Sequence, residues 1–226
     1  MNTNYSWNLT NSSGNHIVKV CSDDTLQAEV VTEYIKEGLL NEEAAIIFAR
    51  TSLRKKVIAN LENLGVDVGH YKSIGKLKFF DAEFILTNFH IDGTVDESAF
   101  IDVIGLPIQA IKREFGKVRV FGEIVNVLWK NEEHAAAMHL EECWHNLCQA
   151  IDFSFLCSYS LESLDSTAFD ESINLLCQYH KHLTPVHADL PAIENEDSIL
   201  HGFGAAWNRV TEKLAASNPN QPTFSS

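Results

Sequence analysis

The chain has 226 residues, of which 17 are Lys or Arg and 31 are Asp or Glu, so its formal net charge is −14. Such an acidic chain does not suit nucleic-acid binding, because contacts to phosphate groups need clustered Lys and Arg. Hydrophobic residues make up 45% of the sequence, which excludes wholesale disorder, and no apolar run reaches the roughly 18 residues of a membrane span.

Short apolar strands alternate with amphipathic helices in the first part of the chain. Strands are expected at residues 16–21, 44–49 and 76–80, where β-branched or aromatic runs are bounded by turn residues. Apolar side chains recur at helical spacing over residues 25–40 and 52–65. This alternation favours a three-layer α/β fold, in which helices cover both faces of a parallel sheet.

The alternation continues through the middle of the chain. In order, we expect a short helix at 82–89, a loop at 90–96, a long helix from Asp96, a strand at 118–123, a pair of helices at 123–129 and 134–151, and a strand at 153–159. Gly93 permits a turn with positive φ in the loop. Pro107 should kink the long helix, because proline removes a backbone donor.

The C-terminal part is expected to be an appendage. The predicted organisation is a flexible N-terminus at 1–15, a main domain at 16–183 that ends in a helix at about 166–182, a linker at 184–197, a helix at 198–216 and a disordered tail at 217–226. The helix at 198–216 carries one apolar stripe, which must pack on the core, on a second copy or on a partner.

Several stretches, taken together, resemble the MEDS sensory domain, a degenerate relative of RecA/KaiC-like ATPase domains. They are HIVKVCSDD, EGLLNEEAAIIFA, LENLGVDV, GKLKFFDAEFILTNFHIDGTVD, VRVFGEIVNVLW, LEECWHNL and FSFLCSY. The resemblance implies a RecA-like α/β sensor that binds a small, hydrocarbon-derived ligand and passes the signal on. This sequence has His90 where the family tends to have Met.

The turn after the first strand argues against nucleotide binding. A phosphate-binding loop needs glycines and a Lys between this strand and its helix, whereas the turn here is Cys21-Ser22-Asp23-Asp24-Thr25. Its carboxylates would repel a phosphate and satisfy the helix N-terminus themselves. The loop is therefore a degenerate P-loop, and neither tight ATP binding nor any cofactor is expected.

A ligand pocket is expected at the carboxyl ends of the parallel strands, where open α/β sheets bind their ligands. The sequence suggests a site that contains His16, Asp81, His90, Glu123 and Trp129. Asp81 would serve equally as a helix N-cap, and Glu123 as a helix start. As a site acid, Glu123 should be replaceable by Gln with folding largely intact. Core packing is the alternative role for Trp129, and also for Trp144.

Catalytic and metal-binding patterns are weak. The five cysteines are odd in number and form no CxxC pair, so they are expected to act as small hydrophobic residues. His139 and Cys143 share helical spacing, but two ligands do not make a zinc site. A pair of Cys157 with His16 would place a nucleophile inside an apolar strand. Glu141 and His145 are expected to pair on a helix surface.

The sequence thus favours a non-enzymatic, cytoplasmic sensory domain. Its expected partners are a small-molecule ligand and a signalling protein, such as a histidine kinase or a transcription regulator; no nucleic acid and no membrane are expected, no metal site is assigned, and a homo-oligomer is left open. The start of the sequence does not have the pattern of a secretory signal. Two alternatives remain: a degenerate RecA/KaiC-like nucleotide-binding protein, and a pure protein-interaction module.

Overall fold

The computed structural model describes residues 16–21, 23–160 and 183–186. The predictions of a flexible N-terminus, of a helix at 166–182, of a C-terminal helix at 198–216 and of a disordered tail lie outside the described residues. Of the linker expected at 184–197, the structure describes residues 184–186.

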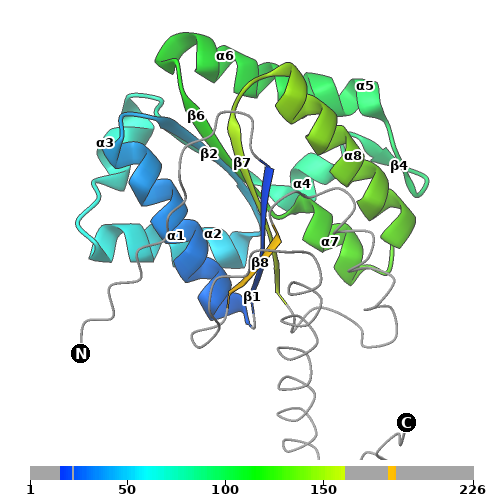
Figure 1. Cartoon of the computed structure of the whole chain (residues 1–226), viewed down its shortest axis with the longest axis horizontal. Helices are drawn as coiled ribbons and strands as arrows, with labels where there is room; N and C mark the ends of the chain where they lie inside the picture. The colour runs from blue at the N-terminus through cyan, green and yellow to red at the C-terminus, as the bar shows by residue number, and fades with distance from the viewer. Residues whose placement is uncertain (1–15, 22, 161–182, 187–226) are drawn as a thin grey trace, which may run out of the picture.

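Within the described residues, six parallel strands form the central sheet (Figure 1). In spatial order they are β3 (Leu77–Asp81), β2 (Ala44–Ala49), β6 (Val118–Gly122), β7 (Ser154–Ser160), β1 (His16–Cys21) and β8 (Leu183–Val186). The first five of these strands match the strands predicted from the sequence to within a residue. The predicted three-layer parallel α/β class is confirmed.

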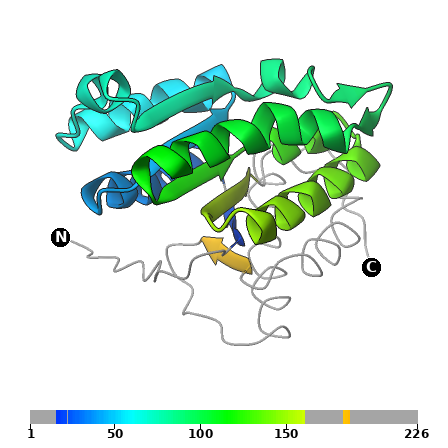
Figure 2. The same cartoon turned by 90° about the horizontal axis from the view of Figure 1, so that it is seen from above.

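Strand β8 corrects the sequence interpretation, which assigned residues 184–186 to a linker. Its backbone pairs with β1, from Val18 opposite Leu183 to Cys21 opposite Val186. It lies beside β1 at the edge of the sheet (Figure 2). An edge is where a strand tolerates proline, which has no N–H for the ladder. Pro185 therefore fits this strand, although it reads in the sequence as a linker residue.

Helices cover both faces of the sheet (Figures 1 and 2). On one face lie α1 (Asp24–Leu40), α2 (Thr51–Asn63) and α3 (Val68–Ser73). On the other lie α4 (Ala82–Leu86), α5 (Glu97–Phe100), α6 (Leu106–Phe115), α7 (Ile124–Lys130) and α8 (His134–Ala150). Because side chains alternate along a strand, each strand supplies both cores: Ile46 packs with the second group of helices and Ile47 with the first.

The side chain of Asp23 caps the N-terminus of helix α1. Asp23 Oδ1 accepts hydrogen bonds from the backbone amides of Thr25 at 2.9 Å and Leu26 at 2.8 Å. These amides are among the groups that a helix N-terminus offers to an anion. The prediction that a carboxylate satisfies the start of this helix is therefore confirmed.

The loop predicted at 90–96 is a short β-hairpin. Strand β4 (His90–Ile91) pairs antiparallel with β5 (Thr94–Val95). Asp92 and Gly93 between them have φ of 52° and 76°, and positive φ at both central residues is the pattern of a type I′ hairpin turn. The positive φ predicted for Gly93 is confirmed, but the pairing of such short strands was not predicted.

The long helix predicted from Asp96 is divided into three parts. Asp96 caps α5, accepting from the Ala99 amide at 2.9 Å. A π-helical turn, η1 (Ile101–Gly105), then precedes α6, which carries Pro107 near its start. Proline leaves an acceptor in the preceding turn without its donor and crowds that turn. The π-helical turn in front of Pro107 accommodates both the missing donor and the crowding.

Candidate functional site

Strands β2 and β6 are neighbours in the sheet, and the chain leaves their carboxyl ends in opposite directions. From β2 the chain runs to the neighbouring strand β3, whereas from β6 it runs the other way to β7. Such a divergence leaves room outside the strand ends, and open α/β sheets bind ligands there. The residue after β2 is Arg50 and the residue after β6 is Glu123, so the fold places a charged pair at this point.

Glu123 is fully buried and is held by Arg50. Its Oε1 accepts from Arg50 Nε at 2.8 Å and from Nη2 at 2.6 Å, and its Oε2 accepts from the Arg50 backbone amide at 2.8 Å. Burial alone would lower the pKa of the Arg50 guanidinium, but the contact with Glu123 outweighs it and raises that pKa. Glu123 thus fixes Arg50 in position, and it makes no side-chain cap to α7.

Asp81, at the end of β3, holds a second arginine. Its Oδ1 accepts from the Phe84 amide at 3.1 Å, which caps α4, and its Oδ2 accepts from Thr51 Oγ1 at 2.9 Å and from Arg54 Nη2 at 2.7 Å. Partial burial would raise the pKa of Asp81, but these hydrogen bonds and the Arg54 charge outweigh it and lower that pKa. The N-cap role that the sequence suggested for Asp81 is thus confirmed, and its second carboxylate oxygen holds Arg54.

We call Arg50, Thr51, Arg54, Asp81 and Glu123 the edge network. Its two guanidinium groups are partly exposed, with side-chain accessibilities of 19% for Arg50 and 24% for Arg54. Arg54 Nε is buried and has no hydrogen-bond partner among the residues that the structure describes. A guanidinium carries five N–H donors, so the network retains donor capacity for an oxygen-bearing ligand.

Two of the predicted site residues have other partners. The His90 ring nitrogen Nε2 lies 2.9 Å from a carboxylate oxygen of Glu133. Trp129 is buried in the core, and its ring centroid lies 4.6 Å from that of His134. Because Glu133 and His134 are adjacent in the chain, these contacts connect the β4–β5 hairpin, α7 and the start of α8. They do not join the edge network.

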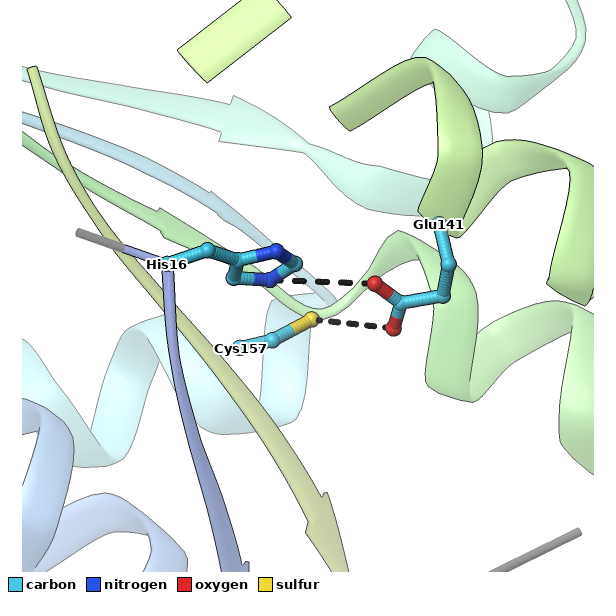
Figure 3. Close-up of side chains that lie close together, drawn as sticks. All are labelled: His16, Glu141 and Cys157. Carbon is cyan, nitrogen blue, oxygen red and sulfur yellow. Dashed lines mark hydrogen bonds and ion pairs between the residues drawn. The ribbon is translucent and has the colours of Figure 1, made fainter. Parts of the chain in front are cut away.

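His16 belongs to a third group, inside the core (Figure 3). Its Nε2 lies 3.7 Å from Oε2 of Glu141, and Oε1 of Glu141 lies 3.6 Å from Sγ of Cys157. We call these three residues, from β1, α8 and β7, the buried cluster. The predicted surface pair of Glu141 and His145 is wrong, because Glu141 is fully buried and His145 Nε2 instead lies 2.9 Å from the amide of Gln149.

The buried cluster does not have the properties of a nucleophile site. Burial raises the pKa of the Cys157 thiol well above its ordinary value, and the Glu141 carboxylate acts in the same direction. Only a thiolate is a good nucleophile. In addition, the thiol lies against the carboxylate and the Gly122 carbonyl, at 3.6 and 3.5 Å. The expectation that Cys157 and His16 form no catalytic pair is consistent with this geometry.

A second group with the same three residue types lies nearer the surface. Oε1 of Glu97 on α5 lies 2.9 Å from Nε2 of His139 on α8, and Cys143 follows His139 by one helical turn. We call these residues the surface cluster. The sequence suggested two of them and missed Glu97, which arrives from a helix some 40 residues away.

Most of the remaining predictions concern packing, and the structure confirms them. Trp144 is fully buried and stacks on Phe155, with ring centroids 4.1 Å apart. Four of the five cysteines are described, and all four are free and buried: Cys21, Cys143, Cys148 and Cys157. Cys177 lies outside the described residues. In the described part of the chain, none of the helices has the length and apolar character that crossing a membrane requires.

The sequence analysis missed the central residues of the edge network and of the buried cluster. Arg50 and Arg54 were not singled out, although Arg50 follows a buried strand directly, just as Glu123 does. Glu141 was assigned to a surface, although it follows Ala137 by four residues and precedes Trp144 by three. A carboxylate at the spacing of the apolar face was the available signal for burial.

Comparison with models of known protein families identifies a match. A family model described as MEDS, methanogen/methylotroph, DcmR sensory domain, matches residues 15–181. A search of curated proteins gave no match. The matched range contains the edge network, the buried cluster and the surface cluster.

Proposed function

The chain belongs to the MEDS family of sensory domains, and from this premise we propose that it binds a small ligand at the edge network and relays binding to a signalling protein. The family supports a sensory role. The ligand site and the relay are our proposals, and they rest on the position and the chemistry of the edge network.

The main support is Arg54. Its Nε is buried without a hydrogen-bond partner among the described residues, although Thr51 and Asp81 hold the neighbouring Nη2 within 2.9 Å. A buried donor without an acceptor costs free energy of about 1–3 kcal/mol. A ligand oxygen at this position would remove that cost. The site therefore favours a small organic ligand with carboxylate or hydroxyl oxygens.

The network is also suited to report binding. Thr51 and Arg54 lie on α2, Asp81 connects β3 to α4, and Glu123 connects β6 to α7. A ligand that competes for either guanidinium would shift the balance of contacts among these elements, which cover opposite faces of the sheet. A histidine kinase or a transcription regulator is the kind of partner that would receive such a signal.

A nucleotide-binding role has less support. Asp23 already accepts the amides at the start of α1, and a phosphate would have to displace a negative charge from them. Calorimetry with Mg·ATP should show no binding in the micromolar range. A non-enzymatic role is likewise our proposal, since the family is one of sensory domains.

The ligand site can be tested with a panel of short-chain carboxylates, alcohols and amines, added at millimolar concentration to the full chain and followed by chemical shifts of ¹⁵N-labelled protein. We expect saturable binding of at least one oxygen-bearing compound, with shifts centred on residues 50–54 and 81–84. Arg54→Gln should weaken that binding at least tenfold, about 1.4 kcal/mol, because it removes the guanidinium.

The matched control is Arg113→Gln, at an exposed arginine of α6, which should bind as the wild type does. If Arg54→Gln and the wild type bind equally, or if no compound of the panel binds, the edge network is not the ligand site.

A further inference from the structure

Three kinds of donor atom converge within the core. His16 supplies a ring nitrogen from β1, Cys157 a sulfur from β7 and Glu141 a carboxylate from α8, and all of these atoms lie within 4.8 Å of one another. In Figure 3 the imidazole and the thiol both point toward the carboxylate. The imidazole and the thiol, from two different strands, thus face the two oxygens of one carboxylate.

Each of the two Glu141 oxygens faces one partner, at a separation close to that between neighbouring ligands of one ion. His16 Nε2 and Glu141 Oε2 are 3.7 Å apart, longer than the usual N–H···O distance of about 2.7–3.2 Å. Zinc bonds of about 2.0–2.3 Å in tetrahedral geometry place neighbouring ligand atoms about 3.3–3.6 Å apart. The sulfur–oxygen separation of 3.6 Å matches this value, and the nitrogen–oxygen separation needs only a small contraction.

The three side chains of the buried cluster are removed from solvent. Glu141 is fully buried, and His16 and Cys157 are 8% and 1% exposed. An ionised carboxylate in such surroundings needs a compensating positive charge or a proton. A divalent ion would compensate the carboxylate and, by binding the sulfur, would displace the thiol proton to solvent.

The ligand types narrow the choice of ion. Calcium and magnesium take oxygen ligands almost exclusively. A thiolate and an imidazole with one carboxylate suit a borderline transition-metal ion such as Zn²⁺. We propose that His16, Glu141 and Cys157 form a buried binding site for a zinc-class divalent metal ion that ties β1 and β7 to α8. This inference is independent of the ligand proposed for the edge network.

The surface cluster provides an internal comparison. It has the same residue types, but Glu97 and His139 are only 2.9 Å apart, the length of an ordinary hydrogen bond, and Glu97 has a side-chain accessibility of 70%. Water and the histidine satisfy that carboxylate without an ion. A metal ion bound by this chain is therefore expected at the buried cluster, and the surface cluster is the natural competitor to exclude.

The test uses the full chain, purified without chelators from zinc-supplemented cells. Its zinc content is measured by mass spectrometry of the elements, and the chelator-treated protein is then titrated with Co²⁺ during refolding. We expect about one zinc per chain, a near-ultraviolet absorption band from thiolate-bound Co²⁺, and a melting temperature that zinc raises by several degrees. Cys157→Ser should abolish the band and the bound zinc.

The matched control is Cys143→Ser, which removes the thiol of the surface cluster and should retain both signals. Since Cys157→Ser could unfold, His16→Gln serves as a second variant, because it keeps the thiol in place and should still lose most of the zinc. Circular dichroism checks the fold of each variant.

Two results would overturn the proposal. One is a wild-type chain that holds no zinc and gives no thiolate–cobalt band. The other is a signal that survives Cys157→Ser and disappears in Cys143→Ser, which would assign the metal to the surface cluster. Neither result bears on the binding of short-chain compounds by the edge network, so the two proposals fail separately.

Discussion

Glu123 in the edge network and Glu141 in the buried cluster are both completely buried carboxylates, but their partners differ in kind. Glu123 receives three hydrogen bonds of 2.6–2.8 Å from an arginine, whose charge is permanent. Glu141 faces an imidazole and a thiol at 3.6–3.7 Å, and both of these groups can change protonation or bind a metal. The partner of Glu123 therefore has a constant charge, whereas the charge of the partners of Glu141 can change.

The largest effect is expected at Glu123. Glu123→Gln places an amide N–H₂ against the donors of Arg50 and leaves the guanidinium without its counter-charge. Breaking a buried pair in this way costs about 3 kcal/mol, so the melting temperature should fall by roughly 6–12 °C in a chain of this size. Thermal denaturation followed by circular dichroism measures the change, with the exposed Glu62→Gln as control.

This expectation reverses the one from sequence, which treated Glu123 as a site acid whose replacement leaves folding largely intact. The burial of the side chain and its three hydrogen bonds are the reason. A melting temperature within 2–3 °C of the wild type, about 1 kcal/mol, would restore the earlier view.

A smaller effect is expected at Glu141 in metal-free protein. Gln has nearly the same shape and can still accept from the thiol, and the imidazole lies too far away, at 3.7 Å, to lose a hydrogen bond, so Glu141→Gln should cost about 1 kcal/mol. The adjacent exposed Glu142→Gln is the control. Urea denaturation of both variants and the wild type measures the difference. A loss as large as that of Glu123→Gln would mean that the partners of Glu141 are as fixed as Arg50.

Asp81 provides an intermediate case, because it is partly exposed. Asp81→Asn keeps a good helix cap and loses the charge opposite Arg54, so the cost should be only about 0.5 kcal/mol at pH 7. The pKa of Asp81 is lowered in the folded state, so its charge contributes stability above the unfolded pKa of about 3.9 and loses it as pH falls through the folded value.

The difference between wild type and Asp81→Asn should therefore be constant from pH 7 to about pH 5 and shrink below about pH 4. Urea denaturation at pH 6, 4 and 3 measures it. A difference that grows on acidification would show that the pKa of Asp81 is raised by burial instead.

The smallest effect is expected at the exposed pair of Glu42 and Lys76, whose Oε2 and Nζ atoms are 2.7 Å apart. The carboxylate of Glu42 has a side-chain accessibility of 87%, so solvent screens the pair and Glu42→Gln should leave the melting temperature unchanged. A measurable loss of stability in Glu42→Gln would show that burial does not determine how much each carboxylate contributes to the stability of this protein.

The sequence predicted the layers of the fold well, because the runs around Ile46 and Val120 are apolar enough to require burial on both sides. The sequence predicted less of the edge network and of the buried cluster, because their contacts join residues that lie far apart in the chain. Nothing local indicates that His16 meets a carboxylate more than 120 residues away. Likewise, Glu141 has the spacing of a surface pair with His145 and also the spacing of the apolar face of α8, and the packing of α8 on the sheet decides that Glu141 is buried.

The position of β1 has a consequence for the order of events during synthesis. Strand β1, the first strand in the described part of the chain, pairs with β7 and β8, and His16 lies opposite Phe155, 139 residues later. At a synthesis rate of about 5–20 residues per second, the strand that pairs with β1 is made roughly 7–28 s after β1 itself. The β2–β3 pair, by contrast, completes within 40 residues of chain. The nascent protein therefore assembles from its middle, and the amino-terminal strand is inserted late into a sheet that has already begun to form.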